Sequence, residues 1–152
     1  MAATSAISML QDDHKKMKKI MSELDATTER GVKTREELFG KMRGELTIHE
    51  QIEEEIFYPA LREHKKAEEI VLEGYAEHHA VDLLVDELDA VPFDDESWGP
   101  KFTVIKENIE HHIEEEEGDM FEKARAVLDA GELAELGERM LQLKQRKQSS
   151  AA

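Results

Sequence analysis

Two stretches of this sequence, His49-Glu50-Gln51-Ile52-Glu53 and His112-Ile113-Glu114-Glu115-Glu116, each place a glutamate four residues after a histidine. Residues four apart lie on the same face of an α-helix, so the two side chains of each pair can bind one cation together. Apolar residues recur around both pairs at helical spacing, which predicts that these faces point into a helical core. Burying ionised carboxylates in a core is very costly unless positive charge meets them. No lysine or arginine occurs on these faces near the pairs, so bound cations are expected there.

Two further histidines, His14 and His78, also lie on apolar stripes, which gives one inward histidine for each of four expected helices. The spacing predicts helices over about residues 5–27, from a capping box at Thr34-Arg35-Glu36-Glu37 past Pro59, over about 67–90, and through a segment that includes residues 102–120. Pro59 is expected to perturb or kink the second helix near its end, because proline lacks an N–H.

Residues 91–100 form the expected loop before the fourth helix, and a short fifth helix is expected after Gly131 with a frayed polar tail. We therefore predict an all-α fold, an up-down-up-down antiparallel four-helix bundle with a short C-terminal fifth helix. Residues 1–152 would form one domain, with the core over about 5–128 and the short helix and tail over 131–152.

The two halves of the chain resemble one another. His14 and His78 are followed by apolar residues at the same four offsets, and His49 and His112 are each followed by glutamate at +4. His49 lies 35 residues after His14, and His112 lies 34 residues after His78. These matches predict a pseudo-two-fold bundle.

Composition narrows the possible functions. The 152 residues are 37% charged and 39% hydrophobic, with a net charge of −16, so nucleic acid and anionic membranes are not expected partners. Cysteine is absent, which excludes thiolate catalysis, iron–sulfur clusters and cysteine zinc sites. The N-terminal residues lack the pattern of a secretory signal and no stretch is apolar enough to span a membrane, so we expect a cytoplasmic protein.

Imidazole and carboxylate ligands together suit iron, manganese or zinc. Two other dimetal or metal motifs fail on spacing. Ferritin-like proteins use Glu-x-x-His, and no glutamate stands three residues before any of the four inward histidines. His49-Glu50 begins like a His-Glu-x-x-His metalloprotease, but Glu53 occupies the position of the second histidine.

The combined pattern resembles the bacterial hemerythrin-like (HHE cation-binding) family over roughly residues 5 to 128. The segments that carry the resemblance are Asp12-Asp13-His14, His49 to Ala60, Glu77-His78-His79 and Glu110 to Glu117. The resemblance implies a pair of non-haem iron ions joined by an oxo or hydroxo bridge inside the bundle. It also implies that His14 and His49 bind one iron, that His78 and His112 bind the other, and that Glu53 and Glu116 bridge both.

The sequence departs from the oxygen-carrying hemerythrins, whose third helix supplies two histidines four residues apart. Here Gly74 and Asp82 flank His78 at that spacing, so one histidine is missing. The fourth-helix carboxylate is Glu116 at +4 from His112 instead of aspartate at +5. Glu50 resembles an extra ligand in the hemerythrin-like domain of a eukaryotic iron-sensing F-box protein. A solvated glutamate is the alternative interpretation.

Two six-coordinate metal ions offer about twelve ligand positions, and the six side chains with one oxygen bridge leave about two open. An open site favours turnover, so the main hypothesis is a di-iron protein that binds dioxygen or reacts with peroxide or another small oxygen or nitrogen species. Peroxide decomposition is a possible activity. The alternatives are an iron or O2 sensing or storage protein without turnover, and a metal-free helical interaction module. A monomer or weak homo-oligomer is expected.

Several residues near the motifs are predicted to lie outside the ligand set. His79 and His111 should point about 100° away from their inward neighbours. Tyr75 is expected to be a packing residue that could approach the site, and Glu45 could lie behind the ligands. Within the run 114–117, only Glu116 has the inward register, and the rest is expected to be a solvated face.

Overall fold

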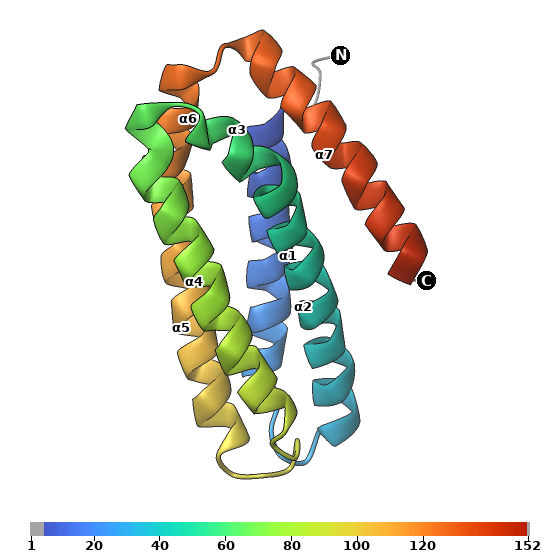
Figure 1. Ribbon diagram of the computed structural model, residues 1–152. Helices are drawn as coiled ribbons and strands as arrows, with labels where there is room; N and C mark the ends of the chain where they lie inside the picture. The colour runs from blue at the N-terminus through green and yellow to red at the C-terminus, as the bar shows by residue number, and fades with distance from the viewer. Residues whose placement is uncertain (1–4, 152) are drawn as a thin grey trace.

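The computed structural model describes residues 5–151, and the side chains of residues 5–150, as an antiparallel bundle of helices (Figure 1). Four long helical stretches run side by side and a further helix crosses the outside of the bundle. Within the described residues there is no β-strand. The elements in chain order are α1 (Ala6–Asp25), α2 (Val32–Ile52), η1 (Glu53–Phe57), α3 (Tyr58–Arg62), α4 (Lys65–Asp89), α5 (Trp98–Glu115), η2 (Glu116–Met120), α6 (Phe121–Val127) and α7 (Ala130–Ala151). The predicted all-α four-helix bundle is confirmed.

The first helix begins as its sequence predicts, whereas the second begins earlier. The Ser5 side chain accepts a hydrogen bond from the backbone N–H of Ser8, and the Ser8 hydroxyl accepts one from the backbone N–H of Ser5. The predicted capping box at Thr34 is wrong, because α2 begins at Val32 and Thr34 lies inside it. The buried Arg35 side chain donates hydrogen bonds to the backbone carbonyls of Thr27 and Phe93, which fixes the start of α2 against two loops.

Two π-helical turns interrupt the second and fourth long helices. The segment η1 begins at Glu53 and η2 begins at Glu116, the two glutamates of the His-x-x-x-Glu pairs. The sequence placed the perturbation at Pro59, but η1 precedes Pro59, and the corresponding position after η2 is Glu122. Proline is therefore not required for the π-helical turn. Such turns occur mostly as single bulges and often at functional sites.

A polar layer divides the hydrophobic core into two clusters. One cluster lies toward α3, α6 and α7 and includes Leu10, Phe57 and Phe121. The other lies toward the opposite end of the bundle and includes Met21 and Trp98. The four inward histidines and the two glutamates fall between the clusters on every helix that crosses this level.

The last helix is longer and better packed than the sequence predicted. The predicted fifth helix is confirmed, but α7 has 22 residues and runs to Ala151, so it is longer than the short helix that the sequence predicted. It packs against α1 and α2 on the outside of the bundle (Figure 1). Leu136, Met140 and Leu143 are buried in the cluster that also contains Leu10, which explains why the helix continues beyond the predicted length.

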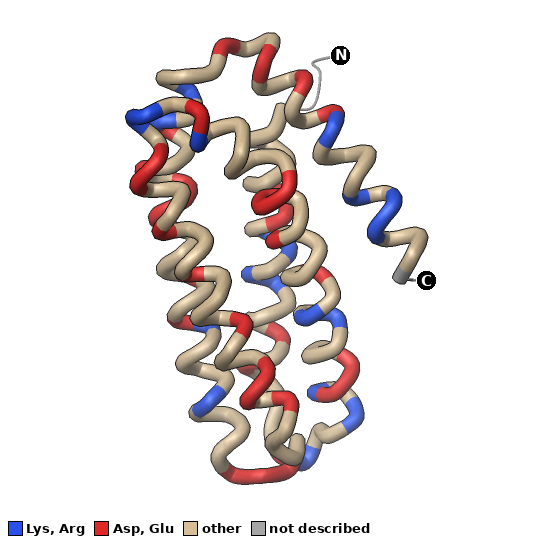
Figure 2. Tube along the Cα trace, in the orientation of Figure 1, with Lys and Arg blue, Asp and Glu red and all other residues tan. Residues whose placement is uncertain are grey.

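Charge is distributed unevenly over the fold (Figure 2). Basic residues recur along the C-terminal half of α7, whereas acidic residues follow α4 and the loop before α5. Among the described residues, no helix is long and apolar enough to cross a membrane.

Replacing the fully buried Met140 by alanine should lower the free energy of unfolding by about 2–5 kcal/mol, because it leaves a cavity between α7 and the bundle. Chemical denaturation of the purified protein measures this. Gln145→Ala, on the exposed face of the same helix, serves as the control and should change stability by less than about 0.5 kcal/mol. Equal, small effects of both substitutions would show that α7 does not pack as described.

Candidate metal centre

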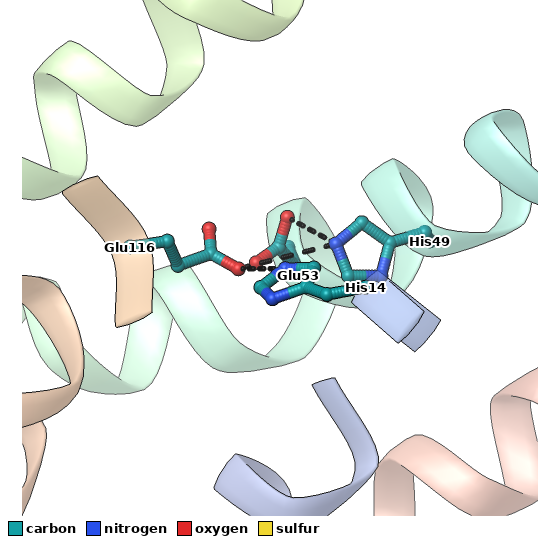
Figure 3. A group of neighbouring side chains, drawn as sticks. All are labelled: His14, His49, Glu53 and Glu116. Atoms are coloured by element: carbon teal, nitrogen blue, oxygen red, sulfur yellow. Dashed lines mark hydrogen bonds and ion pairs between the residues drawn. The ribbon is translucent and has the colours of Figure 1, made fainter. Parts of the chain in front are cut away.

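Six buried side chains from four helical stretches meet in the polar layer, and they form two overlapping groups that could each hold a metal ion. Glu53 belongs to both groups. Figure 3 shows the first group, in which the imidazole rings of His14 and His49 face the carboxylates. The first group contains His14, His49, Glu53 and Glu116, and the second contains Glu53, His78 and His112. The structure thus brings together all six residues that the sequence singled out as ligands.

Each imidazole presents its Nε2 atom to a carboxylate oxygen at the centre. Glu116 reaches His14 with Oε1 at 3.0 Å and His112 with Oε2 at 3.2 Å. Glu53 uses Oε1 for both His49, at 3.2 Å, and His78, at 3.0 Å. Both glutamates therefore touch histidines from two different helices, as a bridging ligand would.

The other ring nitrogen of each histidine is held by a second carboxylate. An ionised carboxylate can only accept hydrogen bonds, so Nδ1–H is the donor in all four contacts. In a neutral ring, the lone pair is then on Nε2, which points to the centre. Each of these four partners is an acidic residue next in sequence to one of the central side chains. The four contacts are His14 to Glu117 at 2.7 Å, His49 to Asp13 at 2.9 Å, His78 to Glu54 at 2.7 Å and His112 to Glu77 at 2.8 Å.

These outer contacts form a closed ring around the bundle. In each contact, the acidic residue sits beside a central residue on one helix and binds the histidine of the next helix. The order is α1 to α2, then η1 to α4, α4 to α5, and η2 back to α1. The prediction that Glu117 belongs to a solvated face is wrong, because its contact with His14 turns it toward the bundle.

Several buried atoms at the centre lack a hydrogen-bond partner within the described protein. They are Nε2 of His49, Nε2 of His112 and Oε2 of Glu53. Leaving such atoms unsatisfied costs about 1–3 kcal/mol each, and more for charged groups. A cation accepts lone pairs from all three, so this donor set fits a bound metal.

The pKa values of the central side chains also indicate that the centre needs added positive charge. Burial alone lowers the pKa of His112, but the neighbouring carboxylates of Glu116 and Glu77 outweigh burial and raise that pKa to about 10. The pKa of His49 is likewise raised well above its usual value, because the charge of Glu53 and the hydrogen bond to Asp13 outweigh burial. Burial raises the pKa of Glu116, but the neighbouring Glu53, His112 and His14 side chains hold that pKa well below its ordinary value. Protons thus supply the positive charge that a metal would otherwise provide.

The Tyr58 side chain also reaches the centre, although helical spacing in the sequence did not predict it there. The π-helical turn η1 bonds the backbone N–H of Tyr58 to the carbonyl of Glu53, which places the two side chains on the same face. The Tyr58 hydroxyl donates to Oε2 of Glu116 at 2.9 Å and lies 3.4 Å from Nε2 of His78. Gly74 leaves room for it, since a Cβ there would come within 2.8 Å of the hydroxyl oxygen.

Tyr58 breaks the pseudo-two-fold symmetry of the site. Phe121 occupies the equivalent position after Glu116 and stacks on His14, as Tyr58 stacks on His78. The signal in the sequence was Gly74, four residues before His78, because a glycine there leaves space for the Tyr58 hydroxyl.

A cavity of about 30 Å³ adjoins the histidines on the side of the Trp98 cluster. Its apolar lining comes from Met17, Leu46, Val81, Ile109 and Ile113, and Glu45 and Glu50 also line it. Glu50 is 7% exposed and its Oε2 has no hydrogen-bond partner among the described residues, so the solvated interpretation of Glu50 is wrong. Glu50 is not a member of either group of converging ligands.

Comparison with known proteins agrees with this geometry. The sequence model of the hemerythrin HHE cation-binding domain matches residues 5–124. The chain belongs to the hemerythrin HHE cation-binding family. A crystal structure of a hemerythrin HHE cation-binding domain-containing protein from Mycobacterium kansasii has a similar fold, with a TM-score of 0.86 and 28% sequence identity. The match covers 97% of this chain and 89% of that one. No curated protein matched the sequence.

The residues that the sequence placed outside the ligand set of this hemerythrin-family domain also have clear positions. His79 and His111 are exposed and point away from the centre. Tyr75 packs its ring against Tyr58 at 5.1 Å between centroids, and its hydroxyl donates to the Glu54 backbone carbonyl.

The fifth helix of this hemerythrin-family domain also contacts the network. Lys144 Nζ donates to Oδ1 of Asp13 at 2.5 Å, while Oδ2 of the same carboxylate accepts from His49. Burial raises the pKa of Asp13, but the hydrogen bonds and charges of His49 and Lys144 lower it to about 2. Among the described residues, the equivalent carboxylate in the other half, Glu77, forms no ion pair with a lysine; besides His112, it lies near His111 and Glu115.

The metal-free protein should be most stable near pH 4 to 5 and lose stability toward pH 10. His112, with a folded pKa of about 10, contributes stability that is fully present below its unfolded pKa of 6.5 and is lost as the pH rises through 10. Burial and the neighbouring Asp82 carboxylate raise the pKa of Glu50 from 4.5 to about 10, which acts in the same direction. Asp13, lowered from 3.8 to about 2, loses its contribution only below pH 4.

Thermal melting in the presence of a chelator measures this dependence. Protein loaded with metal should lose less stability between pH 6.5 and 10, because the cation replaces the protons. A midpoint that is constant from pH 5 to 10 without metal would contradict the assigned ion pairs.

Proposed function

We propose that this chain is a non-haem di-iron protein that binds dioxygen or reacts with peroxide. The observation that carries the proposal is the convergence of four Nε2 atoms and two carboxylates in one buried layer, with three of their atoms lacking any hydrogen-bond partner among the described residues. Imidazole and carboxylate together suit iron, and the four outer carboxylates strengthen the imidazoles as ligands.

Within this proposal, His14 and His49 bind one iron, and His78 and His112 bind the other. Glu53 and Glu116 bridge the two, which agrees with their contacts to histidines of both pairs. An oxo or hydroxo group completes the bridge. Bound iron would supply the redox chemistry and the open positions at which a small oxygen species binds.

The size of the inner cavity limits the substrate. A volume of about 30 Å³ accommodates one or two molecules the size of water, and its apolar lining favours small uncharged species. Dioxygen, hydrogen peroxide and nitric oxide meet this requirement, whereas an organic substrate does not. The cavity adjoins all four histidines, so a molecule within it would lie beside both metal positions.

Tyr58 is placed to handle a proton at the centre, because its hydroxyl contacts Glu116 and His78. Burial and the charges of Glu53 and Glu116 hold its pKa well above the usual value, so the hydroxyl remains protonated at neutral pH. It can therefore keep Glu116 fixed by a hydrogen bond and offer its proton within the centre.

A second candidate function is iron or dioxygen sensing or storage without turnover. The observation that favours it is the ring of contacts through every long helix, which makes the stability of the bundle depend on what occupies the centre. Peroxide consumption by purified protein separates the two candidates, because a sensor or store would melt at a metal-dependent temperature without consuming peroxide.

Protein produced with iron should contain about two iron ions per chain and show oxo-bridge absorption that changes as peroxide disappears. His78→Ala should lower the iron content and abolish the change in the spectrum, because its ring faces Glu53. The neighbouring, exposed His79→Ala is the matched control and should behave as wild type. Full iron content in both variants would refute the assigned ligands.

Tyr58→Phe should retain two irons and consume peroxide about tenfold more slowly. The substitution removes the hydrogen bond that Tyr58 donates to the Glu116 carboxylate, and a hydrogen bond to a charged group contributes about 1.5–3 kcal/mol. Peroxide consumption and the visible spectrum are the measurements. Tyr75→Phe, which alters a hydroxyl bonded only to backbone, is the control and should leave both unchanged. An unaltered rate in Tyr58→Phe would mean that the tyrosine only fills space beside Gly74.

A further inference from the structure

A groove of about 420 Å³ opens on the surface between α2 and α4, close to the buried centre. Five carboxylates and one guanidinium line it, together with three residues of α2 and one of α4. The charged residues are Arg43, Glu50, Glu54, Glu55, Asp82 and Asp86. The groove therefore carries strong negative charge toward solvent.

The groove and the inner cavity share two lining residues, Leu46 and Glu50. Leu46 is buried in the apolar cluster, so Glu50 is the polar side chain that stands between solvent and the histidines on this path. Glu54, which also lines the groove, holds Nδ1 of His78 with its Oε2. The floor of the groove is thus in direct contact with the network around the centre.

The basic residues that pair with these carboxylates lie at the rim of the groove and not in its depth. Arg43 pairs with Asp86 at 3.0 Å and with Asp89 at 3.1 Å, and Lys147 lies 4.0 Å from Glu55. Within residues 5–150, neither Glu50 nor Asp82 forms an ion pair with a lysine or arginine. The two carboxylates instead line the same groove, where a cation between them would offset the repulsion of their like charges.

We propose that Glu50 and Asp82 form a transient site through which divalent cations pass from the α2–α4 groove to the buried histidines. Glu50 lines both the groove and the inner cavity, is only 7% exposed, and its Oε2 has no hydrogen-bond partner among the described residues. Two carboxylates and water hold a divalent cation weakly, which suits transit better than residence. The inference rests on the proposed metal centre as the destination of the cation.

The path also accounts for the position of Glu50 outside the converging ligands. A resident third carboxylate would join one of the two ligand groups, and Glu50 joins neither. A purely structural glutamate would be neutralised by a lysine or arginine, or would extend into water. Glu50 does neither of these, because it is buried and shares the lining of the groove with Asp82.

The test is the rate at which chelator-treated protein takes up Co²⁺, followed by visible absorption in a stopped-flow instrument and repeated with Fe²⁺ without oxygen. Glu50→Gln keeps the shape of the side chain and removes its charge. It should slow uptake about tenfold, because a charge-lined path raises cation entry by about that factor or more. The final number of ions per chain and their affinity should match wild type.

Two further variants serve as a second test and as a control. Asp82→Asn alters an exposed residue that cannot disturb the core and should also slow uptake several-fold. Asp86→Asn, at the rim and paired with Arg43, is the matched control and should take up Co²⁺ within about twofold of the wild-type rate.

The outcomes separate this proposal from the one on which it rests. Unchanged uptake in Glu50→Gln and Asp82→Asn, with normal final binding, would overturn the path and leave the metal centre intact. Loss of one bound ion in Glu50→Gln would make Glu50 a resident ligand and also overturn the path. Wild-type protein that binds neither Co²⁺ nor Fe²⁺ would overturn both proposals.

Discussion

Six ionisable side chains occupy one buried level of an otherwise apolar bundle, and the rest of the structure is arranged around the cost of keeping them there. Burial of an unpaired charge costs several kcal/mol, so each of these groups needs a partner of opposite charge or a hydrogen bond. The carboxylates beside the central residues meet this need for the outer ring nitrogens. The inner nitrogens and carboxylate oxygens are only partly satisfied by one another, and this imbalance indicates a cation.

The same constraint explains the local geometry of the helices. Both π-helical turns begin at the central glutamates, and each brings the residue five positions later over the ring of a histidine. That residue is Tyr58 in one half and Phe121 in the other. An internally repeated bundle thus carries a chemically unequal centre. Lys144 adds to the inequality, because α7 contacts the outer carboxylate of His49 and not that of His112.

Much of the fold and of the site could be predicted because their signals are local. Four histidines at the spacing of apolar stripes, and glutamates one turn later, identify the inward face of each helix from helical geometry alone. The acidic neighbours Asp13, Glu54, Glu77 and Glu117 were also present in the sequence. Their role was missed because each binds a histidine on a different helix, and periodicity within one helix does not show such contacts.

The errors at α2 and α7 have similar causes. Thr34 has the side chain of a cap, but Arg35 binds carbonyls of two distant loops and the helix begins two residues earlier. The polar tail looks unable to form a stable helix by itself, since an isolated helix of this length is marginal in water. Packing of Leu143 and the contact of Lys144 with Asp13 stabilise it against α1 and α2.

By itself the sequence determined the helical class, the four inward histidines and the pairing of His49 with Glu53 and of His112 with Glu116, because these depend on residues within one or two turns of each other. Only the tertiary structure decided that Tyr58 reaches the centre beside Gly74, that a ring of carboxylates orients the imidazoles, and that Glu50 separates a surface groove from the inner cavity. Each of these depends on the distance between helices far apart in the chain, and that distance is set by packing across the whole bundle.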